Sequence, residues 1–119
     1  MIDVREQILK ELLKVTQNVR ITKPEAIKSF PLIVYGEISN VLFDKWQARI
    51  EYQVDVYTTS FESLISLTNK VNEKMENIGF NRTFISPDYE AREDTKIYHK
   101  TIGYVAMVNT NEKNIYSKF

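Results

Sequence analysis

A run of alternating side chains constrains this chain more than any other feature. The stretch from Ala48 to Tyr57 switches between apolar and polar residues at every position. One set comprises Ile50, Tyr52, Val54 and Val56, and the other comprises Arg49, Glu51, Gln53 and Asp55. Successive side chains of a β-strand point to opposite faces, so this spacing predicts a strand that is buried on one face only. The polar face should meet water or a neighbouring subunit.

The next segment, Thr58 to Ile78, has the spacing of one helical face. Its stripe comprises Phe61, Leu64, Ile65, Val71, Met75 and Ile78, with Thr68 and Asn72 as polar members. Thr59 followed by Glu62 fits a capping box at the start of this helix. Gly79 should end it in the left-handed conformation, and Phe80 should fold back against the last turn.

Weaker patterns predict the remaining elements. Helical spacing extends from about Asp3 to Val19, with Asp3 and Glu6 as a capping box. Composition is typical of strands in three further stretches, Leu32 to about Ile38, Phe80 to Ser86 and Ile97 to Val108. The segment from Asn40 to Gln47 fits either a hairpin connection or a short helical turn, and Pro87 to Lys96 is expected to be a charged loop.

These elements give the order α-β-β-α-β-β and an α+β fold. We expect one mostly antiparallel or mixed sheet of about four strands, with two helices packed on one face. Residues 1–108 should form a single domain, followed by a C-terminal tail at 109–119. Gly103, inside the last strand, suggests a bulge or a close approach by a neighbouring group.

Composition excludes several classes of function. The chain has 119 residues and no cysteine, so disulfides, thiol catalysis and cysteine-based zinc sites are absent. It has no long apolar run, so we expect a soluble protein that does not enter a membrane. Sixteen basic and sixteen acidic residues give a formal net charge of zero, which disfavours dedicated binding to nucleic acid.

Catalytic patterns are sparse. His99, the only histidine, lies between Tyr98 and Lys100 in a predicted strand, without the spacing of a metal site or a nucleophile elbow. We interpret it as a polar strand residue that faces solvent or an interface. No glycine-rich phosphate loop exists, because the three glycines are isolated from one another.

One acidic pattern resembles the PD-(D/E)xK signature of metal-dependent nucleases. Asp88 follows a proline, and Asp94 is followed two residues later by Lys96. Such chemistry needs both carboxylates and the lysine at one metal ion. We expect a loop here, not a hairpin that would hold them together, so a small nuclease is the second hypothesis. The sequence thus predicts no enzyme, with no catalytic, cofactor-binding or metal-binding residue.

Aromatic residues indicate a different kind of site. Phe43 and Trp46 lie in a connection, and Tyr116 and Phe119 lie in the tail, where burial within a small domain is difficult. Aromatic side chains are enriched in interface cores. These four are therefore candidate subunit contacts, although packing against their own domain is equally compatible with the sequence. Candidate exposed loop contacts are Asp88, Tyr89, Glu90 and Arg92.

Several segments of the sequence resemble those of the tail terminator and tail-completion (head-to-tail joining) proteins of bacteriophages. They are FPLIVYGE at Phe30–Glu37, the alternating strand that ends QVDVYT at Thr58, the helix that ends IGF at Phe80, and the stretch from Pro87 to Lys100 that begins PDYE and ends IYHK. The resemblance covers about Phe30 to Val108. These segments are structural motifs and not catalytic signatures. The order of elements also agrees with the family.

The resemblance implies a structural subunit of the virion, at the head-proximal end of the tail, made in the cytoplasm of the bacterial host. It implies a homo-oligomer, usually a hexameric ring, that caps the tail tube and docks to the head connector. The partners would be the major tail protein and head connector proteins, and DNA would pass through the lumen without specific binding. Zero net charge suits such a lumen. Another head-tail connector or minor tail protein, and a small ligand-binding or regulatory module, stay open as alternatives.

Overall fold

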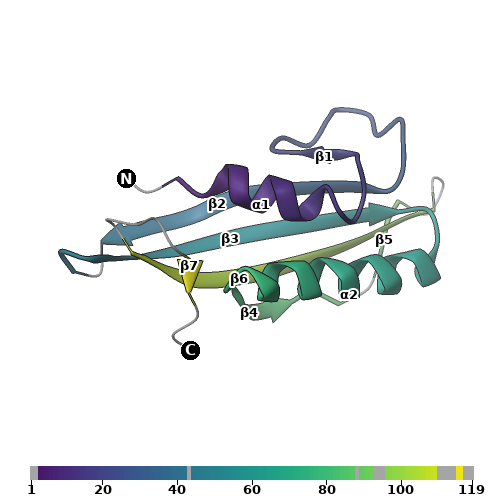
Figure 1. Cartoon of the computed structure of the whole chain (residues 1–119). Helices are drawn as coiled ribbons and strands as arrows, with labels where there is room; N and C mark the ends of the chain where they lie inside the picture. The colour runs from purple at the N-terminus through teal and green to yellow at the C-terminus, as the bar shows by residue number, and fades with distance from the viewer. Residues whose placement is uncertain (1–2, 43, 88, 93–95, 110–114, 117–119) are drawn as a thin grey trace.

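The computed structural model describes residues 3–42, 44–87, 89–92, 96–109 and 115–116 (Figure 1). Two helices and seven strands follow one another along the chain. They are α1 (Arg5–Leu12), β1 (Val19–Arg20), β2 (Leu32–Leu42), β3 (Gln47–Thr58), α2 (Phe61–Asn77), β4 (Asn81–Ile85), β5 (Tyr89–Arg92), β6 (Ile97–Asn109) and β7 (Ile115–Tyr116). The α+β class and the mixed sheet are as predicted. None of the described helices is both long and apolar enough to cross a membrane.

All strands belong to one sheet, with the order β1-β2-β3-β6-β4. β1 runs parallel to β2, and every other pair is antiparallel. β6 pairs with β3 along its whole length, while its other edge meets three short strands in succession: β5, β4 and β7. The sheet therefore has more strands than predicted, because β1, β5 and β7 are only two to four residues long.

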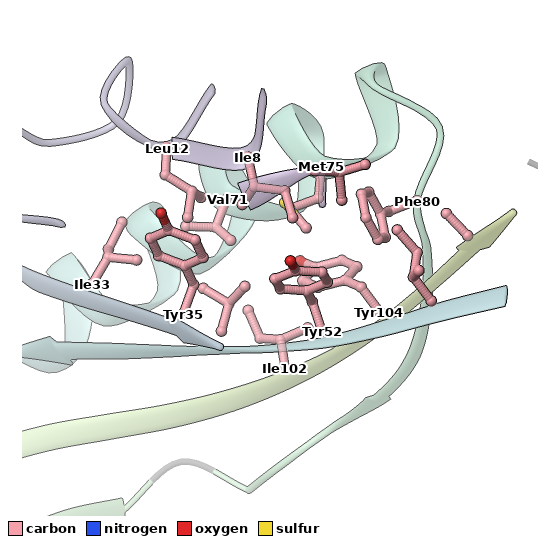
Figure 2. Packing of buried hydrophobic residues seen from close by; sticks show 14 of the residues in the cluster. Ile8, Leu12, Ile33, Tyr35, Tyr52, Val71, Met75, Phe80, Ile102 and Tyr104 are labelled. Atoms are coloured by element: carbon pink, nitrogen blue, oxygen red, sulfur yellow. The ribbon is translucent and has the colours of Figure 1, made fainter. Parts of the chain in front are cut away.

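The core lies between the sheet and both helices, as predicted (Figure 2). The helices contribute Ile8, Leu12, Leu64, Val71 and Met75, and the apolar set of β3 is fully buried beneath them. Tyr52, Phe80 and Tyr104 form a cluster of edge-to-face rings at one end of this layer. Burial of each large apolar side chain contributes roughly 1.5–3 kcal/mol, so this single layer supplies most of the driving force for folding.

The first helix is shorter than its apolar spacing indicates. It ends at Leu12, whereas we expected it to continue to about Val19, and Val19 instead lies in β1. Its N-cap residue is Val4, which makes no side-chain cap, so the predicted capping box is wrong. The Asp3 carboxylate accepts hydrogen bonds from the backbone and side chain of Arg5. Val19 still packs against the core from its strand, so the same apolar periodicity serves two different elements.

The N-cap of the second helix is one residue later than predicted. The Ser60 hydroxyl accepts a hydrogen bond from the Ser63 amide at 3.1 Å, so Ser60 and not Thr59 is the N-cap. Phe61 and Ile65 are exposed and do not face the core, although they share the predicted stripe. The helix is rotated about its axis relative to the predicted stripe, so its buried face contains Leu64, Thr68, Val71 and Met75.

The C-terminus of α2 is as predicted. Gly79 has φ of 108°, which few residues other than glycine adopt, and its amide donates to the Glu76 carbonyl at 3.0 Å. The Phe80 amide donates to the Met75 carbonyl at 3.0 Å. These two bonds form a Schellman motif. Phe80 is buried in the same cluster as Met75, which directs the chain into β4.

A bulge in β4 lies opposite Gly103 of β6, as the glycine suggested. Arg82 pairs with Tyr104 and Phe84 with Gly103, so Thr83 is an extra residue on β4. A β-carbon at Gly103 would clash with the ring of Phe84 and the hydroxyl of Thr83. The glycine therefore lets the Phe84 ring lie directly on the sheet surface that the helices do not cover.

Candidate subunit interface

The long β2–β3 hairpin carries Trp46 at its turn. Asp44 and Gln47 exchange backbone hydrogen bonds of 3.2 and 3.5 Å, which leaves Lys45 and Trp46 as the loop. The Asp44 carboxylate accepts from the Trp46 amide at 2.7 Å and fixes the turn. This resolves the open prediction for Asn40–Gln47 in favour of a hairpin. It also corrects the end of the first predicted strand, since β2 continues past Ile38 to Leu42.

The hairpin projects beyond the helices (Figure 1), and several large apolar side chains near its turn are exposed. Trp46 is 51% exposed and Leu42 is 70% exposed, although both are large and apolar. We call the set Ile38, Val41, Leu42 and Trp46 the hairpin tip. Val41 pairs with Arg49 and Leu42 with Ala48, so these two side chains lie on opposite faces of the hairpin. Exposed apolar side chains are common at protein–protein contacts. Trp46 is thus exposed at the hairpin turn, while Phe43 lies outside the described residues.

Of the two C-terminal candidate contacts, Tyr116 and Phe119, the first lies in a strand at the edge of the sheet. Ile115–Tyr116, within the segment expected to be a tail, forms β7, in which Ile115 pairs with Val108 and Tyr116 with Met107 of β6. Ile115 also packs against the core, close to Gly79 at the end of α2. Phe119 lies outside the described residues. The backbone of Tyr116 is therefore held at the edge of the sheet.

The predicted charged loop is wrong between Tyr89 and Arg92. These residues form β5, in which Tyr89 pairs with His99 and Glu90 with Tyr98. No local pattern predicts this strand, because charged residues are poor strand formers and the pairing with β6 determines the conformation. Of the four candidate loop contacts, Tyr89, Glu90 and Arg92 lie on this edge strand, and Asp88 lies outside the described residues.

A polar cluster on the open face of the sheet was missed by sequence reasoning. Asp55 of β3 meets His99 and Thr101 of β6, with Oδ1 2.9 Å from His99 Nε2 and 2.6 Å from the Thr101 hydroxyl. Gln53 donates to Asp55 Oδ2 at 3.1 Å. Tyr57 stacks on the His99 ring with centroids 4.2 Å apart. His99 is therefore mostly buried, not fully exposed to solvent.

Electrostatics in this cluster favour a charged Asp55. Burial on its own raises the pKa of Asp55, but hydrogen bonds from His99, Thr101 and Gln53 outweigh it and hold the pKa below its usual value. Both Asp55 and Thr101 contact the same ring nitrogen of His99. A catalytic triad needs its acid and its nucleophile on opposite nitrogens. The geometry is that of a satisfied polar network, not of a triad.

The cluster could have been found only by pairing two strands. Its residues are 44 to 46 positions apart in the chain, and alternation on β3 marks Asp55 merely as a member of the polar face. The register that sets Asp55 opposite Thr101 is a property of the sheet. No local motif carries that information.

The nuclease pattern is only partly within the described structure. Asp88 and Asp94 lie outside the described residues, and Lys96 is at a turn with φ of 53°. The residues that are described contain no group of three or more His, Cys, Asp or Glu side chains that could hold a metal ion. The described geometry offers a hairpin with exposed apolar side chains and a satisfied polar network, and the hairpin is the better candidate for function.

Comparison with known proteins identifies the fold. No protein-family model matches the sequence, and no curated protein matches it. Among solved structures, the chain is similar to a chain in the virion of a native gene transfer agent particle, with a TM-score of 0.59 and 11% sequence identity. The match covers 86% of this chain and 91% of the other. The two chains thus share a fold over nearly their full lengths.

Proposed function

We propose that this protein is a structural subunit of a bacteriophage-type virion and not an enzyme. The observation that carries the proposal is the shared fold with a chain of a gene transfer agent virion over 86% of the present chain. The resemblance of sequence segments within Phe30–Val108 to tail terminator and tail-completion proteins supports the proposal independently. The hairpin tip is compatible with it, because its exposed apolar side chains could become buried against a neighbouring subunit.

The specific role we propose is that of a tail terminator or tail-to-head joining subunit. Copies form a ring, taken to be hexameric from the family resemblance, that caps the tail tube and provides a docking face for the head connector. DNA passes through the lumen without specific binding, which suits a chain with zero formal net charge. Its place is then the head-proximal end of the tail, after synthesis in the host cytoplasm.

The test combines the purified full-length chain with tail tubes of its own phage or prophage. We expect rings in native mass spectrometry or negative-stain microscopy, and we expect tubes that carry one ring at a single end. A chain with two substitutions in the hairpin tip, Leu42→Ser and Trp46→Ser, is the matched comparison and should bind tubes less well. A chain that stays monomeric and leaves the tubes uncapped would contradict the proposal.

A further inference from the structure

Two edges of the sheet lack a partner strand in the described part of the chain. β2 pairs with β1 only at Ile33 and Val34, so no described strand covers its outer edge from Gly36 to Leu42. β4 is the outermost strand on the opposite side. An open strand edge is a template for pairing with another chain. Natural proteins usually protect such edges with charges, proline or bulges. The open edge of β2 carries one charged residue, Glu37, and a register shift between Glu37 and Ser39, and its other residues are uncharged.

These two edges lie at the same level of the sheet. The pairing registers define shared rows across it, one through Arg82, Tyr104, Tyr52 and Glu37, and the next through Phe84, Gly103, Gln53 and Gly36. Strand directions alternate from β2 through β3 and β6 to β4, so β2 and β4 run in opposite directions. A second copy rotated about an axis parallel to the strands therefore brings its β4 beside β2 in antiparallel orientation.

Charges at the two edges are complementary. Glu37 and Arg82 share one row, and both pair with residues whose side chains enter the core, so both lie on the helix-covered face. Both side chains are exposed. The Glu37 carboxylate accepts one hydrogen bond from Asn40 at 2.9 Å, and no carboxylate among the described residues forms an ion pair with Arg82. A neighbouring copy would place these opposite charges side by side.

Shapes at the two edges are complementary on the open face. Phe84 of β4 is 47% exposed, and its ring lies over Gly103 on this face. At the same level of β2, a β-carbon added to Gly36 would have no atom within 4 Å. A shallow hollow surrounds that position, lined by Ile21, Val34, Gly36, Ile38, Gln53 and Asp55 among others. Phe84 covers Gly103 within its own copy, so on this face the neighbour's hollow would lie beside the covered glycine.

The correspondence of levels between the two edges extends to the hairpin tip. Val41 lies in the row of Arg49, Met107 and Tyr116, and Leu42 in the row of Ala48, Val108 and Ile115. In the neighbouring copy, β7 occupies the level just beyond β4. The open edge of β2 thus faces first β4 and then β7 of that copy.

We infer that β2 of one copy pairs, through Gly36–Leu42, with β4 and β7 of the next copy. Arg82 meets Glu37, and the Phe84 ring, which lies over Gly103 of its own copy, borders the hollow at Gly36 of the neighbour. Because two different surfaces meet, the contact is heterologous and can close into a ring. This inference rests on the proposed ring subunit, and it supplies the contact between adjacent copies that such a ring needs.

The first experiment fills the hollow with Gly36→Val. Open space at this position means that the variant should keep the melting temperature of the wild type, while the added side chain fills the hollow and crowds the contact beside the neighbour's β4. We expect association, measured by sedimentation velocity and native mass spectrometry, to weaken by about tenfold or more. The control is Ile65→Ala, a change of an exposed apolar residue on α2, which should leave association unchanged.

Charge exchanges and cysteine variants test the orientation and the register of the contact. Glu37→Arg and Arg82→Glu should each weaken association, and the double exchange should restore it, because the charges meet between copies. Since the chain has no cysteine, Ser39→Cys combined with Asn81→Cys introduces the only thiols, and both positions share one row. Under oxidation the double variant should give a ladder of cross-linked copies, whereas either single variant cannot exceed a dimer.

The outcomes separate this inference from the proposed function. If the wild type forms rings but Gly36→Val and the charge variants form them equally well, the edge contact is wrong and the ring subunit stands. If the wild type neither assembles nor caps tubes, and the double cysteine variant gives no ladder at high concentration, both proposals fail. A ladder with restored association in the charge exchange supports the edge contact directly.

Discussion

Asp55 shows what single residues contribute on the face of the sheet without helices. Its carboxylate accepts hydrogen bonds from three side chains on two strands, and the stacked rings of Tyr57 and His99 shield it. Sequence reasoning identified the residues whose identity alone sets a geometry, such as Gly79 and Gly103. It missed Asp55, because a network between strands depends on register and not on local residue type.

Stability should therefore depend on pH through Asp55. Its folded pKa lies below the unfolded value, which is about 3.9. The stabilising contribution is complete above the unfolded pKa and is lost as the pH falls through the folded pKa. We expect Asp55→Asn to lower the free energy of unfolding at pH 7 by about 1–3 kcal/mol. The loss relative to the wild type should shrink towards zero in strong acid.

Urea denaturation from pH 2.5 to pH 7 measures this difference. Glu73→Gln removes an exposed carboxylate on α2 and should change stability by less than about 0.5 kcal/mol throughout. A deficit for Asp55→Asn that stays constant across the pH range would show that the charge of Asp55 does not contribute.

Elements whose pattern extends over many residues were predictable. Elements defined by pairing with another strand were not. The alternation of β3 and the period of α2 predicted both elements to within a few residues, because ten or more positions carry the pattern. β1, β5 and β7 hold two to four residues each and have no period of their own. α1 was predicted too long because Val15 and Val19 pack against the core from outside the helix.

The start of α2 offers a sharp test at this scale. Thr59 and Ser60 are adjacent and both are suitable N-caps, but only the Ser60 hydroxyl accepts from the Ser63 amide. We expect Ser60→Ala to lower the free energy of unfolding by about 1 kcal/mol. Thr59→Ala should change it by less than about 0.5 kcal/mol. Chemical denaturation of both variants, monitored by circular dichroism, compares them, and equal losses would restore the sequence-based assignment of the cap.

The whole molecule divides between a part that folds the chain and a part that extends beyond the fold. The helices and the core-facing residues of the sheet form one buried layer, and the principal extents of 50 × 24 × 22 Å reflect the length of the strands beside it. The β2–β3 hairpin reaches past the helices, so its last residues have no core to enter (Figure 1). Local patterns predict the layer, because burial selects apolar spacing. They cannot show which exposed apolar residues serve a partner.

Stability and assembly should therefore respond to different substitutions. Leu12 is fully buried, so Leu12→Ala should lower the free energy of unfolding by about 2–5 kcal/mol. The pair Leu42→Ser and Trp46→Ser removes two exposed side chains and should lower it by less than about 1 kcal/mol. Association measured on the same samples should fall for the hairpin variant, while Leu12→Ala should associate like the wild type at temperatures where it stays folded. If the hairpin variant loses as much stability as Leu12→Ala, its side chains belong to the fold and not to a contact between subunits.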